Sequence, residues 1–229
     1  LDCANGIWLD KFIDPIIDEL GLSNYICFER GNSGVHRKPR LHQNSIVYTE
    51  VIDFSVNLLE ILVSPFYYLR YRKVYLGLFN AAQNSFFMRR KDFWQIVRLF
   101  ARFDIKRRIF KNVFRRKHVK YLLGVARSGF YPEMVACKEL GIPVFEFQHG
   151  ITVGETVLYS GSVDEMFVPD YFLAFGKMWV GAQFGINCER IKVIGWAYRD
   201  YLRKTLAAIS KKEKYILFAS SSKSGTTMK

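Results

Sequence analysis

The sequence predicts an α/β protein built on a parallel sheet, and three segments in its second half carry that prediction. Residues 121–126 form a continuous apolar run, which is typical of a strand buried on both faces. Residues 132–140 place apolar side chains at helical intervals, with Pro132 in the first turn and Gly141 after the last. Residues 142–147 form a second apolar run. Together they make a strand–helix–strand unit of about 28 residues, a normal length for two parallel strands joined by a helix.

The same alternation continues toward the C-terminus. We expect strands at 171–175, 191–194 and 215–219, with helices at 178–184 and 196–209 between them. Strands that alternate with helices at this spacing indicate a Rossmann-like parallel sheet flanked by helices.

The first half of the chain is expected to add helices and short strands. A helix is predicted at 11–20, where Gly21 can end it, and short strands at 25–28 and 46–48. Residues 51–69 have a helical pattern that we expect to end at Pro65. Asp53, Asn57 and Glu60 interrupt the apolar residues of that last stretch, so the sequence does not predict a membrane-spanning helix there.

Composition and charge narrow the class of protein. The chain has 229 residues, half of them hydrophobic, which excludes a disordered or collagen-like polypeptide. Its net charge is +13. Residues 70–120 alone hold sixteen basic and two acidic side chains, a net charge of +14. We predict that this segment forms one or two amphipathic helices with a densely cationic face.

The basic segment has three possible interpretations: it contacts an anionic membrane surface, it binds nucleic acid, or it is a solvated helical face with no partner. Its aromatic residues lie at core-like helical spacing rather than as an exposed stacking platform, and no nucleic-acid-binding module is recognisable, so nucleic acid is the least favoured. We favour the membrane, where each Lys or Arg adds about 1 kcal/mol near anionic lipid. The residues expected to face it are Arg107, Arg108, Arg115 and Arg116.

The cysteines and the chain ends give two further expectations. Cys3, Cys27, Cys137 and Cys188 are scattered without metal-ligand spacing, which favours reduced thiols over a zinc site or a disulfide framework. The chain begins without Met and ends just after a predicted strand, so we expect it to be part of a longer protein.

Chemically useful residues follow two of the predicted strands. Gln148, His149 and Gly150 come directly after the strand at 142–147, and ligands of open α/β sheets bind beyond such strand ends. A histidine there can act as a general base near neutral pH, and a glycine lets the backbone approach a ligand closely. The alternative is a histidine that only hydrogen-bonds its own loop.

The strand at 121–126 ends at Arg127 and Ser128. An arginine in that position can bind a phosphate or a sugar carboxylate with two hydrogen bonds, and the alternative is an ordinary surface arginine.

Three stretches resemble a known family. Gly141 to Gly150 (GIPVFEFQHG), Tyr171 to Gly176 (YFLAFG) and Ile191 to Asp200 (IKVIGWAYRD) look like motifs of bacterial GT-B-fold glycosyltransferases that build capsule and lipopolysaccharide. The HG at a strand end is also similar to the CDP-glycerol glycerophosphotransferases of teichoic acid synthesis. The resemblance covers about 110 residues, from Tyr121 onward.

The resemblance implies one half of a GT-B fold. Residues 1–209 would be an N-terminal, Rossmann-like acceptor-side domain carrying residues 70–120 as a basic helical insertion, and residues 210–229 the linker and first strand of a second domain. It implies no cofactor, because the nucleotide-sugar donor is itself a substrate, and no residue is assigned as a metal ligand. The other partners would be a glycan or lipid-linked acceptor and the inner face of the membrane, so the protein would be cytoplasmic and peripherally attached.

The resemblance also implies roles for single residues. His149 would be the catalytic base, with Glu155 as a rival base or as the residue that orients it. Substrate would contact Arg127, Ser128, Gln148, Gly150, Arg199 and Asp200. Ser220, Ser221 and Ser222 would contact the donor phosphates, although they lack the spacing of a P-loop. For Arg199 and Asp200 the alternative is a local ion pair.

Two other functions stay open at this point. One is a non-catalytic Rossmann-like module that binds a membrane or nucleic acid. The other is a nucleotide-sugar epimerase with a GT-B fold. A DxD motif of the GT-A type is not recognisable in the sequence.

Overall fold

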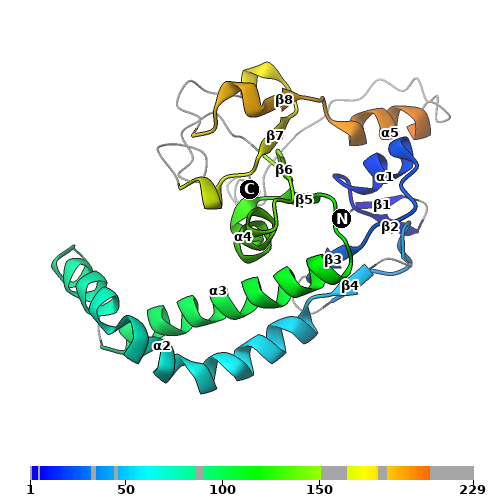
Figure 1. The fold of residues 1–229 in the computed structure, drawn as a ribbon. Coiled ribbons are helices and arrows are strands. Elements are labelled where there is room, and N and C mark those ends of the chain that lie inside the picture. Colours follow the sequence, from blue (N-terminus) through cyan, green and yellow to red (C-terminus); the bar gives the residue numbers. More distant parts are fainter. Residues whose placement is uncertain are drawn as a thin grey trace, which may run out of the picture.

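The computed structural model describes residues 2–4, 6–31, 35–43, 46–85, 90–150, 164–179 and 185–206. Across these ranges the protein is a mixed α/β structure with parallel strands flanked by helices, which confirms the predicted fold class at that level (Figure 1). The helices are α1 (Asp14–Leu20), α2 (Glu50–Ser85), α3 (Arg90–Arg116), α4 (Tyr131–Glu139) and α5 (Ala197–Leu206). The strands are β1 (Asp2–Ala4), β2 (Ile7–Leu9), β3 (Cys27–Glu29), β4 (Ile46–Tyr48), β5 (Leu122–Val125), β6 (Val144–Phe147), β7 (Tyr171–Ala174) and β8 (Ile191–Val193).

The largest sheet has four parallel strands in the order β5-β6-β7-β8. In its register Leu122 lies beside Val144, and Phe172 lies between Glu146 and Ile191. All four strands were expected from the sequence. Since they are parallel and in chain order, the loops that follow them leave the sheet at the same edge.

The main core lies between this sheet and two helices. Phe110 and Phe114 of α3 pack with Met134 of α4 and with Val144 of β6, and all four are buried. Phe28 of β3 joins them, with its ring edge-on to Phe110. Phe110 and Phe114 of the basic segment are therefore core residues, as their spacing predicted, whereas Phe100, which the same pattern placed on the core face, is 46% exposed.

A glycine shapes the turn from β5 into α4. A Cβ on Gly124 would lie 2.3 Å from the ring of Phe130, so only glycine lets that ring pack across the strand. A short 3-10 turn, η1 (Arg127–Gly129), follows the strand, where we expected a loop.

The helix predicted to end at Pro65 continues to Ser85, so that prediction is wrong. Pro65 lies on the exposed side of α2, where the helix loses one backbone hydrogen bond without burying the unpaired carbonyl of Ile61. Ser64 supports the same turn by donating its hydroxyl to the Glu60 carbonyl. The helix bends instead at Tyr71, which has non-helical dihedrals (φ −112°, ψ 20°). Figure 1 shows α2 running alongside α3, with α4 on the other side of α3.

The N-terminal region forms two small sheets and a helix. β1 and β2 pair antiparallel, whereas β3 and β4 pair parallel. α1 starts later than the predicted residue 11, because Asp10 accepts hydrogen bonds from the backbone N–H groups of Phe12 and Ile13 and forms a turn there. Gly21 ends the helix in the left-handed region (φ 56°), as expected.

The C-terminal predictions are confirmed in part. The helix expected at 196–209 is α5, and its last residues lie outside the described ranges. At 178–184 the described residues form only a 3-10 turn, η3 (Lys177–Trp179), and the rest of that segment is outside the described ranges. The strand expected at 215–219 and the predicted boundary at 209 also lie outside them.

Candidate functional site

The candidate site is the edge of the main sheet at which β5 to β8 end. The loop after β5 presents the exposed Ser128, and the loop after β6 presents the exposed His149 and Gly150. The turn after β8 contains Gly195 in the left-handed region (φ 76°). The fold thus brings the predicted strand-end residues to one edge, as expected for a parallel sheet.

Gln148 fixes the loop that carries His149. Its side chain is buried, and its Nε2 donates to the Gly150 carbonyl at 2.7 Å. Its Oε1 accepts from the backbone N–H of Phe175, after β7, at 2.8 Å. Gln148 was predicted to contact substrate, whereas its amide is used within the protein, where it ties the loop after β6 to the end of β7.

Arg127 is also turned inward. Its guanidinium is 2% exposed, and its Nε lies 3.0 Å from Oε2 of Glu146, which is fully buried in β6. The backbone N–H of Arg127 donates to Oε1 of the same carboxylate at 2.8 Å. Arg127 is therefore not the ordinary surface arginine that the sequence left open, and its role as a phosphate or carboxylate ligand stays a prediction. Both groups are charged, so they need each other inside the protein.

The backbone just before Arg127 is strained. Ala126 has φ 59° and ψ 85°, a region that residues with a side chain rarely occupy. Such conformations persist where the surroundings impose them, and they concentrate at functional sites. Here the imposed turn holds Ser128 and Gly129 at the exposed edge.

An aromatic ring from the N-terminal region, that of Phe12, packs at this edge against rings that follow β7 and β8. The Phe12 ring stacks on Phe175, with centroids 6.4 Å apart, and Phe175 lies 5.7 Å from Trp196. The Nε1 atom of Trp196 is buried without a hydrogen-bond partner among the described residues. Sequence reasoning missed this group, because Phe12 and Trp196 are about 180 residues apart.

Arg199 and Asp200 lie in the first turn of α5, and both are exposed. Arg199 Nε is 3.7 Å from Asp200 Oδ1, and Arg203 is at the same distance from that oxygen. This is the local ion pair that the sequence left open as the alternative. Glu155 and Ser220, Ser221 and Ser222 lie outside the described residues.

A second group of charged residues gathers where β3 and β4 end. Arg30 Nη2 lies 2.6 Å from Asp53 Oδ2, and Lys106 of α3 pairs with the same carboxylate. Glu133, in the first turn of α4, is close enough to these three residues for their charges to influence its pKa. Burial raises the pKa of Glu133, and its Oε2 atom has no hydrogen-bond partner in the described structure. In the sequence, the only indication of this charged group was Asp53, one of the polar residues that interrupt the apolar run of residues 51–69.

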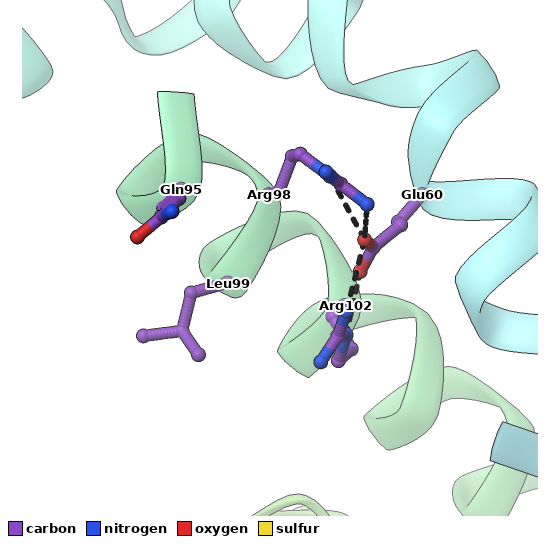
Figure 2. Close-up of a pocket in the computed structure, with 5 residues that line it drawn as sticks. All are labelled: Glu60, Gln95, Arg98, Leu99 and Arg102. Atoms are coloured by element: carbon purple, nitrogen blue, oxygen red, sulfur yellow. Dashed lines mark hydrogen bonds and ion pairs between the residues drawn. The ribbon is translucent and has the colours of Figure 1, made fainter. Parts of the chain in front are cut away.

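Much of the predicted cationic face of α3 is paired with acidic side chains of the protein. Arg98 and Arg102 both bind Glu60, whose side chain is fully buried, at 2.7 and 2.6 Å (Figure 2). Burial would raise the pKa of Glu60, but the hydrogen bonds from the two arginines outweigh it and leave the pKa below its ordinary value. A small pocket lies over this group, lined also by Gln95 and Leu99.

The four arginines expected to face a membrane divide into two pairs. Arg107 binds Asp104 and Glu139, and Arg108 lies 2.9 Å from Asp104. Arg115 and Arg116, at the end of α3, are exposed, and neither has an ion pair within the described part of the chain.

Metals and cysteines give no further site among the described residues. No group of three or more His, Cys, Asp or Glu side chains there has the arrangement of a metal site. Cys27, Cys137 and Cys188 are free thiols, and burial raises the pKa of Cys137 to about 12.

Comparison of the chain with protein-family models, with curated proteins and with solved structures found no match.

Proposed function

We propose that this chain is the acceptor-side half of a GT-B-type glycosyltransferase, which moves a sugar from a nucleotide-sugar donor to a glycan or lipid-linked acceptor. The observation that carries the proposal is the position of His149. It is exposed at the end of a buried parallel strand, in a loop that Gln148 holds by two hydrogen bonds. The motif resemblance supports the same interpretation.

In the proposed reaction His149 takes the proton from the acceptor hydroxyl. The freed oxygen bonds to the anomeric carbon of the donor sugar, and the bond from that carbon to the phosphate oxygen breaks. The nucleotide diphosphate leaves with the electron pair of that bond. A positioned base of this kind accelerates a reaction by about 100-fold to 10,000-fold.

The rest of the edge has supporting roles in this proposal. Ser128 and the backbone at Gly150, which are exposed at this edge, contact the acceptor in the proposed complex. Arg127 and Glu146 hold the turn after β5 from inside. The donor is bound by a second domain, to which Ser220, Ser221 and Ser222 contribute phosphate contacts.

The test is nucleotide release by the intact protein with a panel of nucleotide sugars. His149→Asn is expected to lower kcat by about 100-fold or more. The matched control is His118→Asn, because His118 is exposed at the end of α3 and its left-handed backbone (φ 50°) suits asparagine. Glu155→Gln separates the rival base: a loss in that variant with unchanged turnover in His149→Asn removes His149 from the mechanism. Absence of turnover with every donor favours the non-catalytic module.

A further inference from the structure

The outer side of α2 carries an apolar stripe. Its members lie on one side of the helix and are all exposed: Val51, Phe54, Leu58, Ile61, Leu62, Phe66 and Leu69. Leu62 and Phe66 expose 68% and 71% of their surface. Over Glu50–Ala82 the helix is long and apolar enough to cross a membrane, and most of its apolar part is exposed. A contiguous apolar surface of this kind marks an interaction site.

Two acidic residues of α2, Asp53 and Glu60, lie on its inner side, whereas the polar Ser55 and Asn57 are exposed. Glu60 binds Arg98 and Arg102, and Asp53 binds Lys106, so both acids face α3. The Ser55 hydroxyl lies near the stripe and donates to the Val51 carbonyl at 2.8 Å, which satisfies it within the helix. The α2–α3 pair buries apolar side chains such as Val56 and Val97 as well as Glu60, and it also exposes the apolar stripe, whereas a surface helix made for water exposes polar residues.

Cations follow the stripe directly. Arg70, Arg72 and Lys73 are exposed at the bend of α2, and no acidic residue is exposed along the described stripe beside them. An apolar helix face bordered by Lys and Arg is suited to acyl chains and anionic headgroups together. A second copy of the chain would present the same cations and no acid to pair with them.

We infer that the outer face of α2 is a membrane contact surface, with its apolar stripe in the acyl-chain boundary and Arg70, Arg72 and Lys73 at the headgroup phosphates of an anionic bilayer. The helix lies in the membrane plane, because α3 runs along its inner side and packs in turn on α4 (Figure 1). This moves the contact from the predicted arginines of α3, half of which are neutralised, to α2. The inference does not depend on sugar transfer.

The experiment is binding of the intact chain to vesicles of phosphatidylcholine alone or mixed with phosphatidylglycerol. The double variant Leu62→Glu/Phe66→Glu is expected to lower the partition coefficient by at least about tenfold on the mixed vesicles. Both side chains are exposed, so the fold is expected to survive, which circular dichroism checks. The matched control is Leu20→Glu on α1, which is 65% exposed and is expected to bind like the unaltered chain.

A second part of the experiment tests the three cations. Charge reversal of Arg70, Arg72 and Lys73 is expected to remove the preference for phosphatidylglycerol, by about fivefold for each residue at low salt. Insertion is read from Phe66→Trp, whose added emission is expected to be quenched by lipids brominated in the acyl chains.

Three results would overturn the inference. The first is unaltered binding by Leu62→Glu/Phe66→Glu. The second is an absence of quenching in Phe66→Trp. The third is a chain that ignores both vesicle types and forms a dimer that the double variant dissociates, which would make a second copy the occupant of the stripe.

Discussion

The α2–α3 helix pair and the β5–β8 sheet bury similar residues and differ in what they expose. Each region buries apolar side chains, such as Val97 in the helix pair and Val144 in the sheet, and each encloses a carboxylate, Glu60 or Glu146. The sheet exposes polar strand-end residues such as His149, whereas α2 exposes a stripe of leucines and phenylalanines. The kind of side chain that is exposed therefore separates the two surfaces.

The largest expected effect tests the polar network inside the sheet region. Glu146→Ala leaves Arg127 buried without its carboxylate, which is expected to cost about 3–5 kcal/mol of unfolding free energy in urea titrations. The double variant Arg127→Met/Glu146→Leu removes both charges and is expected to be much closer to the unaltered chain. A loss of less than about 1 kcal/mol of unfolding free energy in Glu146→Ala would show that the Arg127–Glu146 pair does not stabilise the turn after β5.

Replacing a glycine by alanine is expected to change the free energy of unfolding in opposite directions in the two regions. Gly124→Ala places a methyl group against the Phe130 ring and is expected to destabilise the protein by about 1–3 kcal/mol. Gly77→Ala in α2 meets nothing within 4 Å and is expected to stabilise the protein by about 0.5–1 kcal/mol. Thermal unfolding of the two variants measures both. A change in stability of the same sign in both variants would contradict the difference in packing around Gly124 and Gly77.

A smaller effect is expected inside the helix pair. Glu60→Ala removes the carboxylate shared by Arg98 and Arg102, and both arginines, being nearly half exposed, can turn to water. The expected cost is about 1–2 kcal/mol, below that of Glu146→Ala. Urea unfolding of the two variants gives the ranking, and a larger cost for Glu60→Ala would reverse it.

The smallest effect concerns pH. The pKa of Glu60 is lowered in the folded protein, so its stabilisation is present above its unfolded pKa near 4.5 and is lost as the pH falls through the folded value. The pKa of Glu133 is raised by burial, so its contribution is present below that unfolded pKa and is lost as the pH rises through the folded value. Glu133→Gln is therefore expected to raise stability near neutral pH and not in acid. An equal gain at both pH values would contradict this assignment.

Local patterns predicted the sheet well. The apolar runs at 121–126 and 142–147 correspond to β5 and β6, because each is long enough to be buried and a turn with a glycine follows it. The strand-end position of His149 follows from the same pattern, since a parallel sheet places such residues at one edge.

Contacts between distant segments could not be predicted in the same way. Arg127 and Glu146 are 19 residues apart, and the residues around Arg127 in the sequence did not indicate that its side chain points inward. The single carboxylate in the apolar strand of β6 was the available signal. Likewise, the acids of residues 51–69 look like interruptions of an apolar helix in the sequence, whereas they are the partners of the basic segment. A net charge counts residues and does not show which of them are paired.

The most direct test of the division into a chemical edge and a membrane face is nucleotide release by the intact protein with two acceptors, one soluble in water and one anchored in anionic vesicles. We predict that His149→Asn loses turnover on both acceptors, by about 100-fold or more. Leu62→Glu/Phe66→Glu is predicted to keep turnover on the soluble acceptor and to lose it only on the vesicles. Full turnover by His149→Asn on the soluble acceptor, or equal losses on both acceptors in the α2 variant, would contradict the account.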